Sequence, residues 1–244
     1  MRDDLEGFEA ASQGDAVPEI VEPRHAASLI LVDKTGDTPR FLMGRRSKGH
    51  GFMPGVFVFP GGAVEAGDLE IADRFALSPH AQARLEARTN LDRAMLPALP
   101  LAAVRETFEE TGLIVGSSSP FENPPQNWSG FAAVGTCPRC DALVPVARAI
   151  TPPDFPIRFD ARFFAANAAN LVPSSHNDRH DVSDELEDLG WYDVRELAEM
   201  RLAEITRRIL RDIESRLLAA TLFDPRQEMP FYHVENGVSH RDLL

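Results

Sequence analysis

Three glutamates lie within five positions of one stretch of this chain. The stretch AAVRETFEETGLIVG, residues 102–116, contains Glu106, Glu109 and Glu110. If it is helical, these side chains occupy positions i, i+3 and i+4, which lie about 5–6 Å apart on one face. The spacing therefore predicts an acidic stripe along one side of a helix.

This stripe conflicts with the stability of the helix that carries it. Like charges at i, i+4 cost roughly 0.2–0.5 kcal/mol per pair, and negative charge near a helix C-terminus costs roughly 0.3–1 kcal/mol. Arg105 lies four positions before Glu109 and offsets part of that cost. A hard divalent cation such as magnesium or manganese suits a set of carboxylate ligands. A solvated acidic surface is the alternative interpretation.

A glycine pair upstream bears on the choice between a metal site and a solvated acidic surface. Gly61 and Gly62 follow the apolar run VFVF and Pro60. Two glycines let the backbone turn tightly and approach a ligand closely. Two arginines, Arg45 and Arg46, precede this turn and could hold phosphate groups bidentately. A basic loop that pairs with surface acids explains the arginines equally well.

The elements that position these residues can be read from periodicity and turn signals. Leu101, Val104 and Phe108 form an apolar stripe on a helix expected from about Leu99 to Thr111, ended by Gly112. Ser78 and Pro79 suit the start of an earlier helix. Strands are expected in the runs HAASLILVD, FLMGRRS, VFVF, LIVG, IRFDARFFAA and DLGWYDV. Further helices are expected at roughly 131–142 and within 195–223, and the tail from 224 reads as irregular. The mixture predicts an α/β fold built as one sandwich domain.

Composition limits the class of protein. The chain has 244 residues, of which 43% are hydrophobic and 26% charged, as in ordinary globular domains. No apolar run reaches the length of a membrane span, and the N-terminus lacks a secretory signal pattern, so a cytoplasmic location is the expectation. The net charge of -13 argues against broad attraction to nucleic acid or anionic membranes. The acidic segment 1–23 is expected to be disordered, which leaves 24–244 as the domain.

The two cysteines of the chain form a CPRC motif, Cys137 and Cys140. A lone CxxC is half of a zinc site or a redox pair when the context supports either. No second CxxC or histidine-rich partner follows at zinc-finger spacing, so a turn with two thiols is the favoured interpretation.

The glycine pair and the acidic helix together resemble the signature of the Nudix hydrolases, G-x5-E-x7-R-E-U-x-E-E-x-G-U with U apolar. Gly62 matches the opening glycine. Seven positions match the second half: Arg105, Glu106, Phe108, Glu109, Glu110, Gly112 and Leu113. The later run SDELEDLGWYDVREL is similar to the closing acidic loop, strand and helix of the family. The resemblance implies an α/β/α sandwich with a mixed sheet, here with a helical insertion and an extra C-terminal helix.

The chain departs from the signature in two ways. The signature separates its first glycine from its arginine by 14 positions, whereas 43 positions separate Gly62 from Arg105. About 29 residues are therefore inserted, and we place the insertion at about 69–97. Asp68 also stands where the family has a glutamate, so the sequence leaves its role open.

The resemblance implies metal-dependent hydrolysis of a pyrophosphate bond in a nucleoside diphosphate linked to another group. It implies that Glu106, Glu109 and Glu110 bind Mg²⁺ or Mn²⁺, that Arg105 orients them, and that a carbonyl of Gly61 or Gly62 completes the metal shell. The implied catalytic set is thus Arg105, Glu106, Glu109 and Glu110. The candidate substrate-binding set is Arg45, Arg46, Gly61 and Gly62, in which the two arginines are chosen for their position before the glycine turn. A glutamate of this helix, or Glu185 or Glu187 in the later acidic loop, is the candidate general base.

The substrate and the partners stay open at this stage. The interrupted signature and the Arg-Arg-Ser run are similar to the coenzyme A diphosphatase branch, so coenzyme A or an acyl derivative is the first hypothesis. ADP-ribose or a dinucleotide is the alternative substrate, and a non-catalytic module that senses nucleotides is a further alternative. The only expected partner is a small nucleotide. The amphipathic pattern within 195–223 describes either packing or a homodimer contact.

The insertion and the histidines are weaker signals. Leu85, Leu91, Met95 and Leu96 in the insertion could face a substrate as a lid, but docking on the core is the favoured interpretation. Three histidines, His50, His176 and His180, fall in expected loops and are not predicted to bind metal.

Overall fold

A mixed β-sheet forms the centre of the protein in the computed structural model, which describes residues 21–49, 51–172 and 183–244. Nine strands of these ranges join in it, in the order β11-β10-β7-β8-β1-β2-β3, with β4 paired to β1 and β9 paired to β2. The pairs β1–β8 and β7–β10 are parallel and the others are antiparallel. The strands are Arg24–Asp33 (β1), Arg40–Arg46 (β2), Phe57–Val58 (β3), Gly61–Ala63 (β4), Val144–Ile150 (β7), Phe159–Asn167 (β8), Leu186–Tyr192 (β9), Pro230–Glu235 (β10) and Val238–Leu243 (β11). A separate small pair joins Gly116–Ser117 (β5) and Cys137–Pro138 (β6).

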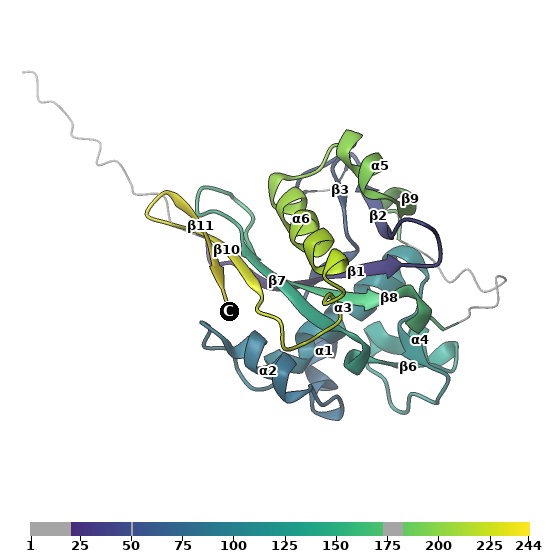
Figure 1. Ribbon diagram of the computed structural model, residues 1–244. Coiled ribbons are helices and arrows are strands. Elements are labelled where there is room, and N and C mark those ends of the chain that lie inside the picture. Colours follow the sequence, from purple (N-terminus) through teal and green to yellow (C-terminus); the bar gives the residue numbers. More distant parts are fainter. Residues whose placement is uncertain (1–20, 50, 173–182) are drawn as a thin grey trace, which may run out of the picture.

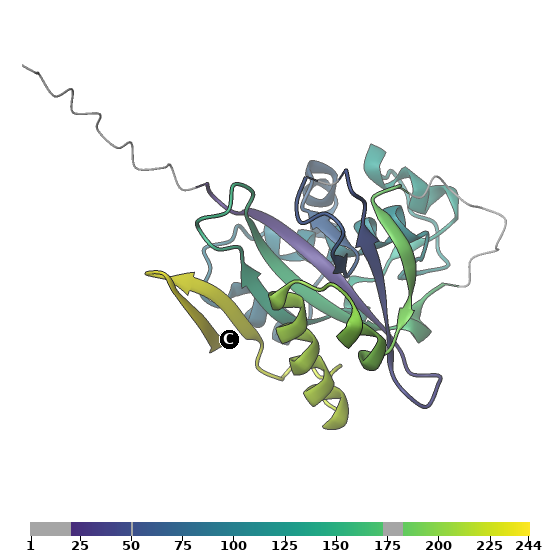
Figure 2. The same ribbon diagram turned by 90° about the horizontal axis from the view of Figure 1, so that it is seen from above.

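Helices cover both faces of the sheet (Figures 1 and 2). The helices are Ala66–Glu70 (α1), Pro79–Glu86 (α2), Met95–Thr111 (α3), Ser129–Ala133 (α4), Val194–Glu199 (α5) and Glu204–Leu218 (α6). One face packs against α3 and the opposite face against α6. The predicted α/β/α sandwich with a mixed sheet, an inserted helix and an extra C-terminal helix is confirmed.

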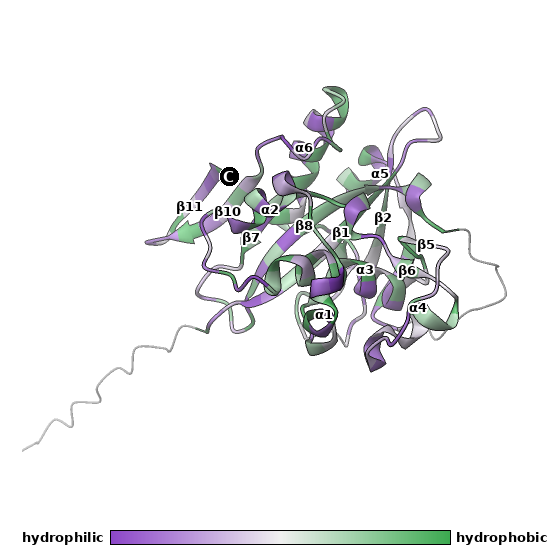
Figure 3. Ribbon diagram, turned by 90° about the horizontal axis from the view of Figure 1, so that it is seen from below, coloured by the Kyte–Doolittle hydropathy of each residue, from purple (hydrophilic) through white to green (hydrophobic). Residues whose placement is uncertain are grey.

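Two apolar cores result from the alternation of side chains along β1. Leu29 and Leu31 point to the α3 side, while Ile30 and Val32 point to the α6 side. The expected apolar stripe of α3 joins the first core through Leu101 and Val104, with Phe108 at its margin. On the other side, α6 has a polar outer face, and Figure 3 shows both hydrophilic and hydrophobic segments along it. The sheet is therefore buried on both faces at its centre.

The insertion docks on the α3 core. Leu85 and Leu96 are buried there and Leu91 packs against them, as the docking interpretation expected. The predicted start of α2 is confirmed, because the Ser78 side chain accepts a hydrogen bond from the Ala81 N–H at 3.2 Å and Pro79 is the first helical residue. Most of the stretch from 87 to 94 is not helical, so the insertion is less helical than expected.

Three further expectations about secondary structure were wrong. The acidic helix α3 begins at Met95 rather than near Leu99: Pro97 lies in its first turn, where an N–H is least needed, and Pro100 is accommodated inside the helix. The expected helix at 131–142 is reduced to the five residues of α4, followed by β6 and a short 3-10 turn. The tail is a hairpin of β10 and β11 around Asn236 and Gly237, both with positive φ.

Several predictions fall wholly or partly outside the described residues. These are the disordered leader, of which residues 1–20 are not described, and the loop histidines His50, His176 and His180. Among the described helices, none is long and apolar enough to cross a membrane.

Candidate functional site

Arg105 is the centre of a buried ion-pair network on α3. Its Nε and Nη2 atoms each donate to Asp68 at 3.0 Å, and its Nη1 donates to Glu106 at 2.9 Å and to Glu109 at 2.8 Å. Nη2 also donates to the Ala63 carbonyl at 3.0 Å. The arginine is 1% exposed. One guanidinium thus fixes two of the three predicted acids and ties α3 to the end of β4.

The hydrogen-bond partners of Asp68 explain why an aspartate stands at this position. It is fully buried and accepts hydrogen bonds from Arg105, from Trp128 Nε1 at 3.1 Å and from the Glu65 N–H at 2.9 Å. The last of these belongs to a capping box at the start of α1. Trp128 is a site residue that the sequence analysis missed, because it falls in a stretch rich in Ser, Pro and Asn with no local pattern that links it to Asp68.

The glycine pair lies directly against the acidic stripe. Gly61 donates its N–H to Glu110 Oε2 at 2.9 Å. A Cβ atom at Gly62 would lie 2.3 Å from Glu106 Oε1, and one at Gly61 would lie 2.3 Å from the Ala27 carbonyl oxygen. Only glycine fits at Gly61, because any side chain would collide with the backbone of β1, whereas a side chain at Gly62 would displace the Glu106 carboxylate. The structure therefore brings Gly61, Gly62, Glu106 and Glu110 together.

Burial raises the pKa values of these acids, because the positive charge nearby does not fully compensate for the loss of solvent. Loss of solvent raises the pKa of Glu106 to about 7, although Arg105 opposes the rise. Loss of solvent raises the pKa of Glu110 to about 8, and the charges of Glu106 and Glu185 add to the effect. For Arg105, burial lowers the pKa, but Asp68, Glu106 and Glu109 outweigh burial and the net shift is upward. The acids thus form a largely buried group of oxygen ligands with excess negative charge.

This oxygen-only ligand set has the chemistry that hard divalent cations prefer. Within the described ranges, however, no group of three or more His, Cys, Asp or Glu side chains stands in an arrangement that could hold a metal ion. Glu106 and Glu109 are turned toward Arg105, and Glu110 toward the Gly61 N–H. The helix backbone thus brings the three carboxylates side by side, and each of them accepts a hydrogen bond from a protein donor.

The two upstream arginines have separate environments. Arg46 is influenced by the charges of Glu110 and Glu185 and donates from Nη1 to the Phe52 carbonyl at 2.7 Å. Arg45 instead pairs with Glu187 at 2.7 Å and with Asp188 at 2.8 Å. Neighbouring residues of a strand point to opposite faces. Only Arg46 of the pair is brought to the acidic cluster.

The two candidate bases of the closing acidic loop, Glu185 and Glu187, lie in different environments. Glu185 raises the pKa of both Glu106 and Glu110 through its charge, so it faces the cluster. Two backbone hydrogen bonds of 2.9 Å hold its segment there, from the Ser183 N–H to the Glu109 carbonyl and from the Ser47 N–H to the Glu185 carbonyl. Glu187 is occupied by Arg45 on β2. Of the two candidate bases, the structure brings only Glu185 to the site.

Two other features lie apart from this cluster. Cys137 and Cys140 are free thiols, and burial raises the pKa of Cys140 far above its ordinary value, which makes the thiol unreactive.

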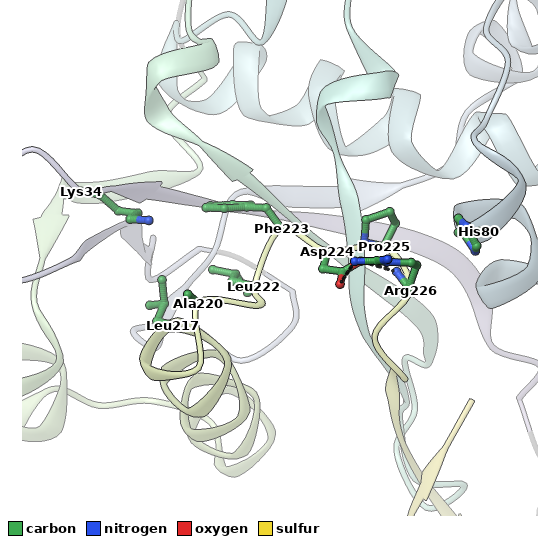
Figure 4. A pocket seen from close by; sticks show the side chains of 9 residues that line it. All are labelled: Lys34, His80, Leu217, Ala220, Leu222, Phe223, Asp224, Pro225 and Arg226. Atoms are coloured by element: carbon green, nitrogen blue, oxygen red, sulfur yellow. Dashed lines mark hydrogen bonds and ion pairs between the residues drawn. The ribbon is translucent and has the colours of Figure 1, made fainter.

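A cavity of about 630 Å³ lies between the end of α6, α2 and the end of β1 (Figure 4). Its lining includes Lys34, His80 and Phe223, and none of the candidate site residues.

Comparison with known proteins agrees with the fold and the acidic cluster. A Caenorhabditis elegans protein with the provisional name nudix hydrolase 7 is 31% identical over 153 residues, which cover 58% of this chain and 43% of that protein. The acyl-coenzyme A diphosphatase NUDT19 of Xenopus laevis is 32% identical over 93 residues, 30% of this chain and 24% of that protein. The crystal structure of a NUDIX hydrolase from Alicyclobacillus acidocaldarius superposes with a TM-score of 0.54 at 26% identity, covering 84% of this chain and 94% of that one. No family model matches the chain.

The chain is thus similar to Nudix hydrolases in sequence and in fold. It spans less than half the length of the curated relatives that it matches.

Proposed function

We propose that this chain is a metal-dependent pyrophosphohydrolase that cleaves a nucleoside diphosphate linked to another group. The observation that carries the proposal is that Glu106 and Glu109 pair with Arg105 while Glu110, on the same helix, accepts the Gly61 N–H at the Gly61–Gly62 turn. A set of buried acids with raised pKa values is expected where a cation is meant to supply the missing positive charge.

Glu106, Glu109 and Glu110 would hold Mg²⁺ or Mn²⁺. When bound, such ions neutralise pyrophosphate oxygens and activate a water. Asp68 fixes Arg105 from the buried side through two hydrogen bonds, so Arg105 keeps its place when Glu106 and Glu109 turn away from it. Arg105 is then a positioning residue for the ligand carboxylates.

Two further residues have roles at the same site. Glu185 faces Glu106 and Glu110, and is the candidate to accept the proton of the attacking water. Arg46 is influenced by the negative charge of Glu110 and Glu185 and is the candidate to bind a phosphate group of the substrate. Arg45 and Glu187 neutralise each other and are matched controls for both roles.

For the substrate we propose coenzyme A or an acyl derivative of it, cleaved into a phosphopantetheine product and 3′,5′-ADP. Support comes from the arginine run before the glycine turn, from the long insertion, and from the partial match to an acyl-coenzyme A diphosphatase. ADP-ribose and dinucleotides belong in the same assay as competing substrates.

The test is a panel of nucleotide substrates assayed with magnesium and with manganese, with products identified by mass. Coenzyme A or an acyl ester should be cleaved most efficiently. Glu110→Gln should lower kcat by about 100-fold or more, since it removes one charged group at the reacting centre. Glu235→Gln, an exposed glutamate on β10, is the control and should retain full activity. Normal magnesium-dependent turnover by Glu110→Gln would defeat the metal assignment, and faster cleavage of ADP-ribose would defeat the substrate assignment.

A further inference from the structure

The strand β11 leaves one edge of the central sheet open. It is the last strand in the sheet order, and among the described strands it pairs only with β10. The hairpin that these two strands form lies at the margin of the molecule (Figures 1 and 2). An open edge presents backbone N–H and C=O groups that can pair with another strand. The sheet can therefore be extended at β11.

The hydrogen bonds of the hairpin show which groups of β11 face outward. Met229 and Leu244 exchange two backbone hydrogen bonds, of 3.1 and 2.9 Å. In an antiparallel pair such residues alternate with residues that do not bond each other. Every second residue of β11 therefore turns its N–H and C=O away from β10, and these residues are Ser239, Arg241 and Leu243. The side chains of all three are exposed, and outside the strand pairs no backbone hydrogen bond of the described residues uses their N–H or C=O groups.

Two apolar side chains of β11 are also exposed to an unusual degree. Val238 is 56% exposed and Leu243 is 53% exposed. Among the large apolar side chains of the described residues, only Leu218 at the end of α6 is more exposed. A strand added at this edge would give both side chains cross-strand neighbours.

The charged side chains of β11 divide between the two faces of the sheet. Arg241 points to the α6 side, where its Nη2 donates to Asp212 at 2.8 Å. Asp242 points to the α3 side, where it pairs with Arg88 just after α2. Because neighbouring side chains of a strand alternate, His240 lies on the same face as Asp242. One face of the edge thus carries a histidine and an aspartate two positions apart.

A second copy of β11 fits this edge best in one register. Two copies related by a two-fold axis normal to the sheet pair as antiparallel strands and keep each side chain on its own face. With Arg241 at the axis, it pairs with its own equivalent, and Ser239 pairs with Leu243 of the second copy on each side. All outward N–H and C=O groups are then used. An axis at His240 or at Asp242 leaves one outward residue of each copy without a partner within the described residues.

The same register is complementary in charge. It places His240 opposite Asp242 of the second copy, twice by symmetry, whereas an axis at either residue places that residue opposite its own equivalent. Arg241 does lie opposite its equivalent, but each arginine is already paired with Asp212, so two ion pairs rather than two bare cations meet there. Hydrogen bonding and charge therefore favour the same alignment.

We propose that this protein forms a two-fold dimer through β11, with Arg241 at the axis and the two central sheets joined into one. The partner is a second copy of this chain, and the inference does not depend on the proposed enzymatic function. The contact differs from the one considered for 195–223, because the apolar face of α6 packs on the sheet. One strand from each copy makes a small interface, so the dimer should be transient, with a Kd on the order of 10 µM.

The experiment measures the association of the full chain by sedimentation velocity. From about 1 to 200 µM the wild-type chain should pass from monomer to dimer. Ser239→Pro removes an outward N–H that β10 does not use and places a ring at the edge, so the Kd should rise at least about tenfold. Ser239→Ala keeps the N–H and is the matched control, with a Kd within about twofold of wild type.

Cysteine substitutions test the register. Arg241→Cys places two thiols opposite each other at the axis, so air oxidation should link two chains by a disulfide that a non-reducing gel detects. His240→Cys is the control, because its equivalent lies on the diagonal, about 7–8 Å away, beyond the reach of a disulfide. The wild-type chain on the same gel shows any background from Cys137 and Cys140.

Three results would overturn the proposal. A chain that stays monomeric at about 200 µM would leave the edge to a different protein. A dimer that persists in folded Ser239→Pro would place the contact elsewhere, and a disulfide through His240→Cys rather than Arg241→Cys would refute the register. If circular dichroism shows that Ser239→Pro is unfolded, Leu243→Lys takes its place. It keeps every backbone group and adds a charge at the edge, and it should also raise the Kd about tenfold.

Discussion

Two buried charge clusters in this protein have opposite excess charge. Around Arg105, one arginine faces the three acids Asp68, Glu106 and Glu109. Around Asp160 on β8, one carboxylate faces two arginines: Arg148 donates to it at 2.9 Å from both Nε and Nη2, and Arg162 Nη1 lies 2.6 Å away. Each cluster costs desolvation free energy, yet only the first lies beside the glycine turn.

The basic cluster is fixed by the protein itself. Arg148 also donates to the Ala87 and Arg88 carbonyls just after α2, and its guanidinium lies 4.4 Å from the centre of the Phe231 ring. Arg162 is fully buried, with its Nε and Nη2 atoms among the described buried polar atoms that lack a hydrogen-bond partner. These contacts join the insertion, β7, β8 and β10. The cluster therefore has a structural role: it holds these elements of the fold together.

The acidic cluster differs in its position, because its acids lie against the Gly61–Gly62 turn. Glu106 and Glu109 share one Nη1 atom of Arg105, and Glu110 accepts a single backbone N–H. A buried charge with fixed partners indicates a structural role, whereas a buried excess beside close-approaching backbone indicates a ligand. Variants that neutralise one acid in each cluster should therefore have opposite consequences.

The largest expected effect is on stability, in the basic cluster. Asp160→Asn leaves Arg148 and Arg162 buried without their counter-charge, so we expect a loss of about 3–5 kcal/mol in the free energy of unfolding. Urea denaturation measures this loss. Turnover per folded molecule should stay near the wild-type value, since Asp160 lies outside the acidic cluster.

Asp154→Asn, at an exposed position of the β7–β8 loop, is the control and should change stability by less than about 0.5 kcal/mol. The pH dependence gives an independent check. Burial raises the pKa of Asp160, but the hydrogen bond from Arg148 and the charge of Arg162 lower it more, so the net shift is downward. Its stabilisation is then present above the unfolded pKa of about 3.9 and is lost as the pH falls through the folded pKa. An acid unfolding curve unchanged in Asp160→Asn would show that the pair contributes nothing.

The next effect is the response to metal, in the acidic cluster. Magnesium at about 100 times its Kd should stabilise the wild-type chain by about 2.7 kcal/mol, measured as a rise in Tm. The rise should vanish in Glu110→Gln and persist in Glu235→Gln. An equal rise in all three proteins would place the bound cation elsewhere on the surface.

The sequence was sufficient for the acidic cluster because that cluster is local. Arg105, Glu106, Glu109 and Glu110 follow one another on a single helix, so helical spacing alone predicts that they share a face. The glycine pair lies far away in sequence, and its place opposite Glu110 came from the resemblance rather than from spacing. The separation of Arg45 from Arg46 needed only strand alternation, but the sequence did not show which of the two faces the site.

The basic cluster could not be predicted in the same way. Arg148, Asp160 and Arg162 come from two strands whose register is set by pairing, and no local pattern shows that Arg148 lies opposite Arg162. The C-terminal hairpin is a different case, because the dipeptide Asn236–Gly237 is a strong signal for a two-residue β-turn. That signal was present in the sequence and was missed, since the flanking residues lack clean alternation.

The smallest expected effect tests whether the insertion stabilises only the basic cluster and not the acidic helix. Ser78→Ala removes the side-chain cap of α2 and should cost about 1 kcal/mol, measured by urea denaturation. Ser78→Asp keeps a capping oxygen and should restore most of the loss. Because α2 leads into the carbonyls that hold Arg148, the loss should shrink in the Asp160→Asn background, where that connection is already broken. The magnesium-dependent rise in Tm should be the same in Ser78→Ala as in wild type. A weaker rise would mean that the insertion also supports the acidic helix, and that the two clusters are coupled through α2 and the start of α3.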